Sequence, residues 1–257
     1  MNFKSFLALL ALIFLNSCQA KEDSIKIKKI ANIAEASGIC YSQKRDSLFV
    51  VGDEGRVYEI DKKGKILTKA YLGKNNFEGI ASDDKKDRLL LAIEGKEHIL
   101  IIDQKKLRKL SKIKIDREYK GKILLKKDWK HHGLEAITLI DNSIFLSNQS
   151  KKFLPKKDPS VIFEIKKVSK KRAKIKSLYD PHIKDISGLD YHEGLLYFVS
   201  DTNDMLYCYD IKDKKIINRY HIKPMALEGV AFDNDNFIYF ADDDGFVYKS
   251  IKSINPL

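Results

Sequence analysis

Carboxylate side chains recur at the same two places in five segments of the chain. Each segment opens with a small or acidic residue before Gly or Ala, and its second apolar run ends in an acid or an amide. The opening residues are Glu78, Glu135 and Glu228, and in the other two segments Ser37 and Ser187, with Glu35 or Asp185 two positions earlier. The closing residues are Asp53, Glu94, Asn148, Asp201 and Asp243.

These ten positions would gather oxygen atoms around one axis if the five segments form a ring. Carboxylates that close together repel one another unless cations, arginines or protons balance them, and Ca²⁺ accepts about 6–8 oxygen ligands. The pattern therefore predicts a calcium-type site with Glu78, Glu135, Glu228, Asp53 and Asp201 at its core, and with Glu94, Asp243 and Asn148 as further ligands. The alternative is that several of these acids bond backbone amides or cap turns.

Two long connections are expected on the same side as the acids. One, residues 116–132, carries His131 and His132 just before Glu135, and the other, residues 149–160, carries Lys151 and Lys152. Long loops on a rigid scaffold often hold functional residues. Together with Glu35 and Asp185, these basic residues are candidates for a ligand-binding face, although the two histidines could equally be exposed loop residues.

The elements that must position the acids are strands. Each segment continues into a third β-branched and aromatic run, and the first four segments have a fourth. Four strands in units of about 41 to 57 residues are typical of propeller blades. The pattern predicts an all-β fold, a five-bladed β-propeller of four-stranded antiparallel blades, in which an N-terminal strand within residues 25–30 completes the last blade.

The N-terminus reads as a targeting segment. Lys4 precedes an apolar run over residues 6–15 that is too short for a membrane-spanning helix, which needs about 20 residues. The sequence Leu15-Asn16-Ser17-Cys18 resembles a bacterial lipobox. This predicts a signal peptide over residues 1–17, a lipidated Cys18 with a tether over 18–24, and a single propeller domain over 25–257. An ordinary signal peptide with a chance cysteine is the alternative.

Charge and cysteine usage narrow the classes of partner. The formal net charge is +12, from 48 Lys and Arg against 36 Asp and Glu. A positive charge of this size favours anionic ligands or lipid headgroups as partners. The lysines are scattered along the sequence, however, and a solvated surface is the simpler explanation for them. Nucleic acid is not expected, since no binding motif is present.

Cys40 and Cys208 lie in strand-like runs and are expected to be buried free thiols.

Several segments resemble the SdiA-regulated propeller lipoproteins. The resemblance rests on residues 36–39 and 48–61, on 185–189 with 199–201, and on 227–233. It implies a propeller fold, an envelope location and a bound cation, without a settled activity. Asn148 departs from the acid usual at its position, which puts equal ligation by all five blades in doubt.

Two functions remain open from the sequence. The favoured one is a monomeric lipoprotein of the bacterial cell envelope, anchored in the outer membrane and facing the periplasm. Its propeller face would hold calcium and a small anionic ligand or a protein partner. The other is a metal-dependent hydrolase of phosphate esters or lactones, because the repeats also look like those of propeller phytases and lactonases. Glu228, Asn148 and Asp201 would then hold the metal that activates water.

Overall fold

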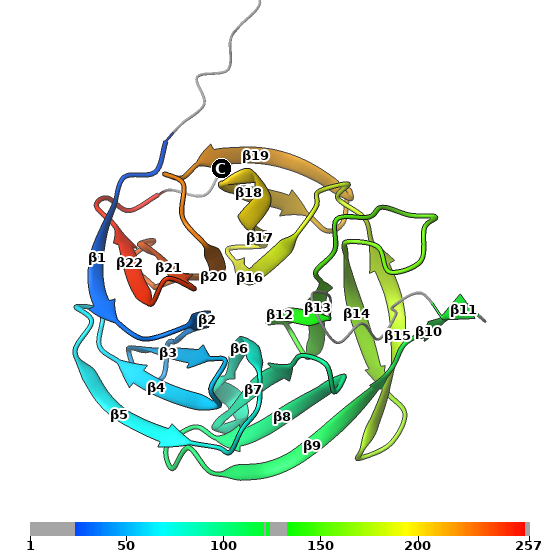
Figure 1. Cartoon of the computed structure of the whole chain (residues 1–257), viewed down its shortest axis with the longest axis horizontal. Helices are drawn as coiled ribbons and strands as arrows, with labels where there is room; N and C mark the ends of the chain where they lie inside the picture. The colour runs from blue at the N-terminus through cyan, green and yellow to red at the C-terminus, as the bar shows by residue number, and fades with distance from the viewer. Residues whose placement is uncertain (1–23, 121, 124–132, 255–257) are drawn as a thin grey trace, which may run out of the picture.

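The strands of this protein are apolar on both faces near the centre of the molecule and polar at its outside. The computed structural model describes residues 24–120, 122–123 and 133–254 (Figure 1). Strand β3 (Ser47–Gly52) is buried at all six positions, whereas β5 (Ile66–Tyr71) is partly or fully exposed at all six. A strand buried on both faces must lie between two layers, so the sheets pack face to face around β3 and its equivalents.

Hydrogen bonding joins the strands of the described residues into three four-stranded antiparallel sheets, one sheet of eight strands and a two-stranded ribbon. The first sheet runs β2 (Ala36–Ser42), β3, β4 (Arg56–Ile60), β5. Another runs β16 (Ile186–His192), β17 (Leu195–Ser200), β18 (Met205–Asp210), β19 (Lys215–His221). A third runs β20 (Leu227–Phe232), β21 (Ile238–Asp242), β22 (Phe246–Ser250), β1 (Ile27–Asn32). The ribbon pairs β10 (Glu118–Tyr119) with β11 (Lys122–Ile123).

The eight-stranded sheet consists of two antiparallel units that meet at their outer strands. The units are β6 (Phe77–Asp83), β7 (Arg88–Ile93), β8 (His98–Asp103), β9 (Lys109–Asp116), and β12 (Leu134–Ile140), β13 (Ser143–Asn148), β14 (Val161–Lys167), β15 (Arg172–Tyr179). Strands β9 and β15 run parallel over three residue pairs, from Arg172–Lys114 to Lys174–Asp116. The all-β antiparallel architecture is thus confirmed. Hydrogen bonding does not divide it into five separate sheets, because this short pairing joins two units.

The innermost strands follow one another around a centre. Strand β2 contacts β6, β6 contacts β12, β12 contacts β16, β16 contacts β20, and β20 returns to β2. Figure 1 shows these five strands at the middle of the molecule, with β5, β9, β15 and β19 at its outside. Each of the five apolar clusters among the described residues fills the space between two successive units. Burial between units therefore holds the ring together.

The first and the last described strands belong to one sheet, as the sequence predicts. Strand β1 pairs antiparallel with β22, from Ile27–Ser250 to Asn32–Phe246, with one irregularity after Lys29. Just before it, Ile25 N–H donates to the carbonyl of His221 at 2.9 Å. Because β1 covers the outer edge of β22, that edge is closed to pairing with another chain.

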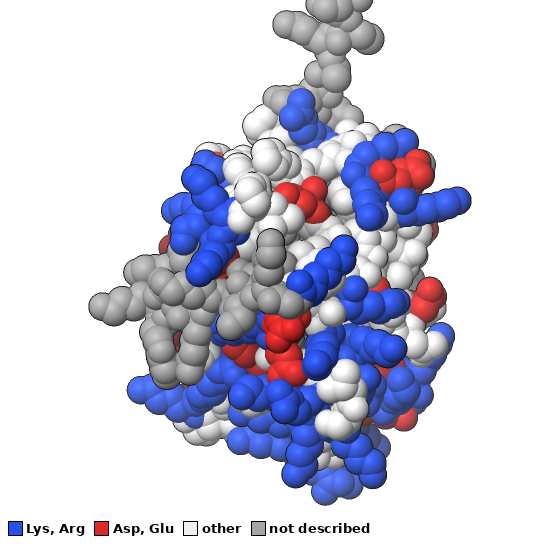
Figure 2. Space-filling model, turned by 90° about the vertical axis from the view of Figure 1, so that its right-hand side faces the viewer, with Lys and Arg blue, Asp and Glu red and all other residues white. Residues whose placement is uncertain are grey.

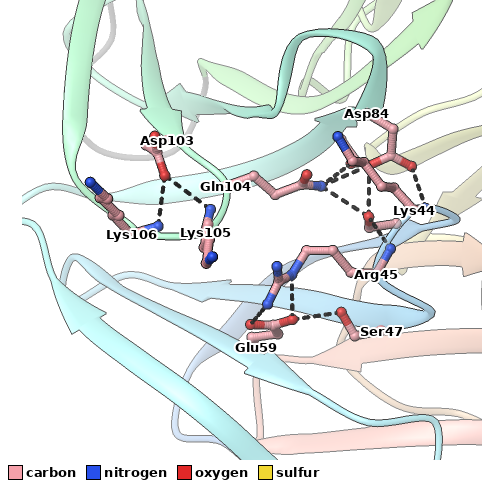
Figure 3. A network of polar contacts seen from close by, with 11 residues as sticks. Lys44, Arg45, Ser47, Glu59, Asp84, Asp103, Gln104, Lys105 and Lys106 are labelled. Carbon is pink, nitrogen blue, oxygen red and sulfur yellow. Dashed lines mark hydrogen bonds and ion pairs between the residues drawn. The ribbon is translucent and has the colours of Figure 1, made fainter.

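A buried polar network fixes the first unit to the second at the end of the ring opposite the acids (Figure 3). The amide nitrogen of Gln104 is within 2.7–2.9 Å of Ser42 Oγ, Ser82 Oγ and Asp84 Oδ1. In the same region Arg45 forms two hydrogen bonds with Glu59, of 2.7 and 3.0 Å. The Gln104 side chain is thus the donor shared by two units.

Replacing Gln104 by leucine is expected to lower the free energy of unfolding by about 1–2 kcal/mol, because it removes a hydrogen-bond donor from the buried Ser42 and from the partly buried Ser82 and Asp84. Chemical denaturation measures the change. Replacing the neighbouring exposed Lys105 by leucine is the control, which should change stability by less than about 0.5 kcal/mol. Equal effects of the two substitutions would contradict the role given to the network.

Candidate functional site

The acidic or serine residue that opens each repeat lies at an irregularity of its innermost strand. The register with the neighbouring strand shifts between Ala36 and Gly38, between Leu134 and Ile137, and at the corresponding places of β6, β16 and β20. A bulge takes one residue out of the ladder and redirects its side chain, and such bulges are common beside active sites. The repeated motif is therefore a repeated bulge, which the sequence pattern does not reveal by itself.

In four of the five innermost strands a glycine follows the bulge and lets neighbouring innermost strands approach closely, whereas β12 has Ala136 at this position. A Cβ atom on Gly79 would lie 2.5 Å from the carbonyl oxygen of Glu135, and one on Gly38 would lie 2.9 Å from that of Glu78. On the other side of the ring, a Cβ on Gly188 would meet the backbone of Gly229 at 2.9 Å. No side chain fits there without backbone movement. Glycine at these positions therefore allows the acid-bearing bulges to lie close together.

Two buried glutamates, Glu78 and Glu135, and the partly buried Glu228 form the centre of the acidic group. Burial, and after it the charges of neighbouring carboxylates, raises the pKa values of Glu78, Glu135 and Glu228 well above the ordinary range. Only 3% of Glu135 is exposed, and Glu78 and Glu228 are among its electrostatic neighbours. Within the described part of the chain, no hydrogen bond or ion pair is found for these three side chains. They therefore favour the neutral form unless a positive charge joins them.

Acids at the strand ends surround these glutamates. Asp53, Glu94 and Asp243 all raise the pKa of Glu78, and Asp201 and Asp243 raise that of Glu228. Burial raises the pKa of Asp53 to about 6, although the Ser37 hydroxyl, which donates a hydrogen bond to it, acts in the opposite direction. The sequence places the residues that open each repeat and those that close its second apolar run in one region. The electrostatic interactions between these residues in the structure agree with that placement.

Individual members of the group differ in their surroundings. Asn148 is buried, and its amide donates to Asp158 at 3.2 Å and to the Pro159 carbonyl at 2.9 Å, so its nitrogen is used within its own loop. The amide of Asn76 donates to Glu94 at 2.7 Å. Asp243 is exposed at the rim. These contacts agree in part with the alternative that some polar residues of the repeats serve local structure.

Glu35 and Asp185, which stand two positions before the serines, lie just outside the innermost strands. Strand β2 begins at Ala36 and β16 at Ile186, and the two acids precede them with φ of 50° and 59°. Both acids therefore have the left-handed backbone conformation immediately before the innermost strand begins. Asp185 nevertheless raises the pKa of Glu135 and Glu228, and the Thr202 hydroxyl donates a hydrogen bond to it.

One of the two predicted loops contacts the acidic group. Lys151 is exposed and is near enough to Asp201 to lower the pKa of that acid, although burial raises it more. Lys152 is also exposed, and its loop is held by a hydrogen bond from Asp185 N–H to the Ser150 carbonyl at 2.9 Å. His131 and His132 lie outside the described residues, as does Cys18.

The structure adds an ion pair that the repeat does not suggest. Glu97, in the turn after β7, is 6% exposed and pairs with Arg117. Burial raises the pKa of Glu97 to about 7, partly opposed by Arg117, and Glu94 and Asp158 raise it further. Because Glu97 stands outside the repeated positions, no sequence signal marks it. The pair brings a guanidinium close to the acidic group.

The acids lie within electrostatic reach of one another without forming a metal cage. Among the described residues, no set of three His, Cys, Asp or Glu side chains is close enough to hold an ion as it stands. The donor set is all oxygen, which suits a hard cation. Cys40 and Cys208 are buried free thiols, as predicted, and neither belongs to the group.

Comparison with known proteins identifies the family. No curated protein matches the sequence. Many solved structures share the fold, and the crystal structure of the Myxococcus xanthus glutaminyl cyclase is one of them. It has a TM-score of 0.58 and 12% identity, over 91% of this chain and 97% of the cyclase chain. At that identity the likeness concerns the fold alone.

Within the described residues, no helix is long and apolar enough to cross a membrane. The sequence matches the family described as SdiA-regulated over residues 15–249, and the chain belongs to that family.

Proposed function

We propose that this protein is a lipid-anchored binding protein of the bacterial cell envelope, built as a five-bladed propeller, whose acidic centre takes a cation of the calcium type. The cyclic order of the five innermost strands supports the five blades, with blades two and three sharing the β9–β15 contact. The lipobox-like sequence at Cys18 supports the anchor.

The buried glutamates carry the cation proposal. Glu135 and Glu78 are 3% and 8% exposed, and the charges that act on them most are those of other carboxylates. An unpaired buried carboxylate costs far more than a paired one, so a group of them is stabilised either by protons or by a bound cation. A cation at this centre would also bind an anionic ligand beside the exposed Lys151 and Lys152.

Calcium is therefore expected to raise the melting temperature of the protein at pH 8, because a ligand that binds only the folded state stabilises it. The measurement is thermal unfolding in EDTA, followed by addition of Ca²⁺ in excess over the chelator. The Glu135→Gln variant should lose most of the rise, whereas Glu193→Gln, an exposed acid in the turn after β16, should keep it. A calcium-independent melting temperature would refute the cation site.

A metal-dependent hydrolase is the second candidate, favoured by one observation. Lys151 acts electrostatically on Asp201, which places a cation beside the acids where a phosphate ester would need one. A metal there would polarise the substrate and activate water. Hydrolysis of model phosphate esters and lactones by the calcium-loaded protein, lost in Asp201→Asn, would support this candidate over simple binding.

A further inference from the structure

The net positive charge of the protein comes from two short segments that contain no acid. Residues 105–114 and 166–176 hold 13 of the 48 Lys and Arg residues, and the other 35 nearly balance the 36 acids. These thirteen residues are Lys105, Lys106, Arg108, Lys109, Lys112, Lys114, Lys166, Lys167, Lys170, Lys171, Arg172, Lys174 and Lys176. All thirteen are exposed. We call them the basic strip.

The fold brings the two segments together at the β9–β15 contact. Arg172 is paired with Lys114 in the parallel register, and Lys114 N–H donates to the Lys171 carbonyl at 2.9 Å. Lys and Arg residues cover much of the lower half of the surface in Figure 2, which views the molecule from the right of Figure 1. Segments about 60 residues apart in the sequence thus form one continuous surface, away from the acidic centre.

Six of the thirteen cations of the strip lie on β9 and β15 themselves: Lys109, Lys112, Lys114, Arg172, Lys174 and Lys176. On β9 Lys112 and Lys114 are exposed while Ile113 and Ile115 are buried, and on β15 Lys174 and Lys176 are exposed while Ile175 is buried. Side chains on one face of a strand recur about every 6.6–6.8 Å. Because β15 continues β9 after a three-residue overlap, the exposed lysines of these two strands form a track of regularly spaced charges.

Few acids neutralise the track. Among the described residues, ion pairs join only two of its members to acids, Arg172 to Asp116 at 2.7 Å and Lys176 to Glu164 at 2.6 Å. Near the start of β9 the neighbours are also positive. Burial, followed by the charges of Lys96 and Lys109, lowers the pKa of Lys112. Like charges held together in this way favour an anion that spans several of them.

We propose that the basic strip binds a linear phosphate-bearing polymer along β9 and β15. Eleven of the thirteen cations are lysines, which bind phosphate as point charges, whereas a site for one small anion would favour the fixed fork of arginine.

Two other polyanionic surfaces fit the strip less well. Its two segments contain no Phe, Tyr or Trp, so they offer no platform for stacking the bases of a single-stranded nucleic acid. A membrane surface would use apolar side chains as well, and the strip exposes only Leu110 and Val168. Moreover, Ser24 lies beside His221 at the end of β19, on the other side of the ring from β9 (Figure 1). A short lipid tether before Ser24 would therefore hold the strip away from its own membrane.

The test measures binding of inorganic polyphosphate to the full-length protein in detergent, at several salt concentrations. The variant Lys112→Gln/Lys114→Gln/Lys174→Gln removes three exposed charges from the strip. The variant Lys63→Gln/Lys65→Gln/Lys212→Gln removes three exposed charges elsewhere, so both variants have the same net charge. The strip variant is expected to bind about tenfold or more weakly, with a shallower dependence of log K on log salt by about 2–3, whereas the control stays within about twofold of the wild type.

Other outcomes would overturn the proposal. Equal losses in the two variants would mean that net charge alone attracts the polymer. Binding of monomeric phosphate as tight as that of the polymer would indicate a discrete anion site. Strip-dependent binding to vesicles containing phosphatidylglycerol, without binding of polyphosphate, would assign the strip to a membrane surface. Thermal unfolding of each variant verifies that it is folded.

Discussion

Replacing Gly79 by alanine is expected to lower the free energy of unfolding by about 3 kcal/mol, at the upper end of the usual cost of overpacking. The new Cβ atom would lie 2.5 Å from the carbonyl oxygen of Glu135 and 2.9 Å from Ala136 Cα. Both are backbone atoms of the next innermost strand, so the clash can be relieved only by separating two units of the ring. Denaturant unfolding at constant pH measures the loss.

Gly133 provides a matched control for this substitution. A Cβ atom there would lie 2.6 Å from its nearest neighbour, which is the Cγ atom of the Glu94 side chain rather than backbone. A side chain can rotate away, and alanine reduces the entropy of the unfolded chain, so Gly133→Ala should cost less than about 1 kcal/mol. If the two alanine variants are equally stable, the close approach of the innermost strands does not limit the fold.

Replacing Glu135 by glutamine is expected to stabilise the protein at pH 8 in the presence of a chelator, by about 2–3 kcal/mol. The buried carboxylate has acids as its electrostatic neighbours, and the amide removes the charge that burial penalises. The control is Glu164→Gln. Glu164 is also buried, but it accepts hydrogen bonds from Lys176 at 2.6 Å and Ser143 at 2.8 Å, so its loss should destabilise the protein. Destabilisation by both substitutions would show that Glu135 has a partner that stabilises its charge.

The same glutamates predict how stability depends on pH without calcium. Their folded-state pKa values are raised, so the folded protein holds more protons than the unfolded chain. Their contribution to stability is then greatest below the ordinary pKa of glutamate, about 4.3, and falls as the pH rises through the higher folded-state values. Asp53 adds a fall between about pH 4 and about 6.

Melting temperatures measured in EDTA should accordingly be higher at pH 5 than at pH 8. The difference should shrink in Glu135→Gln. At pH 8 added calcium should recover part of the stability, because the ion and the protons compensate the same charges. A melting temperature that rises steadily from pH 5 to pH 8 would contradict the assignment of these acids as uncompensated in the folded state.

The sequence by itself determined the class of fold and the position of the acids along the chain. Apolar runs such as residues 48–51, bounded by turn residues, specify strands wherever they occur. Their repetition placed Glu78, Glu135 and Glu228 at equivalent points, and the alternation at residues 25–30 marked the strand that pairs with β22. Each of these features depends on residues that are close in sequence, or on the repetition of such a pattern. They can therefore be predicted from the sequence without the tertiary structure.

Only the tertiary structure decided how the repeats meet. The bulge at each acid depends on hydrogen bonding between strands, and the need for glycine at position 79 depends on the backbone of another unit. The turns at Glu35 and Asp185, the Glu97–Arg117 pair and the basic strip join residues that no periodicity relates. Contacts between distant segments are set by packing around the ring, because burial between units fixes the distances that sequence spacing leaves undetermined.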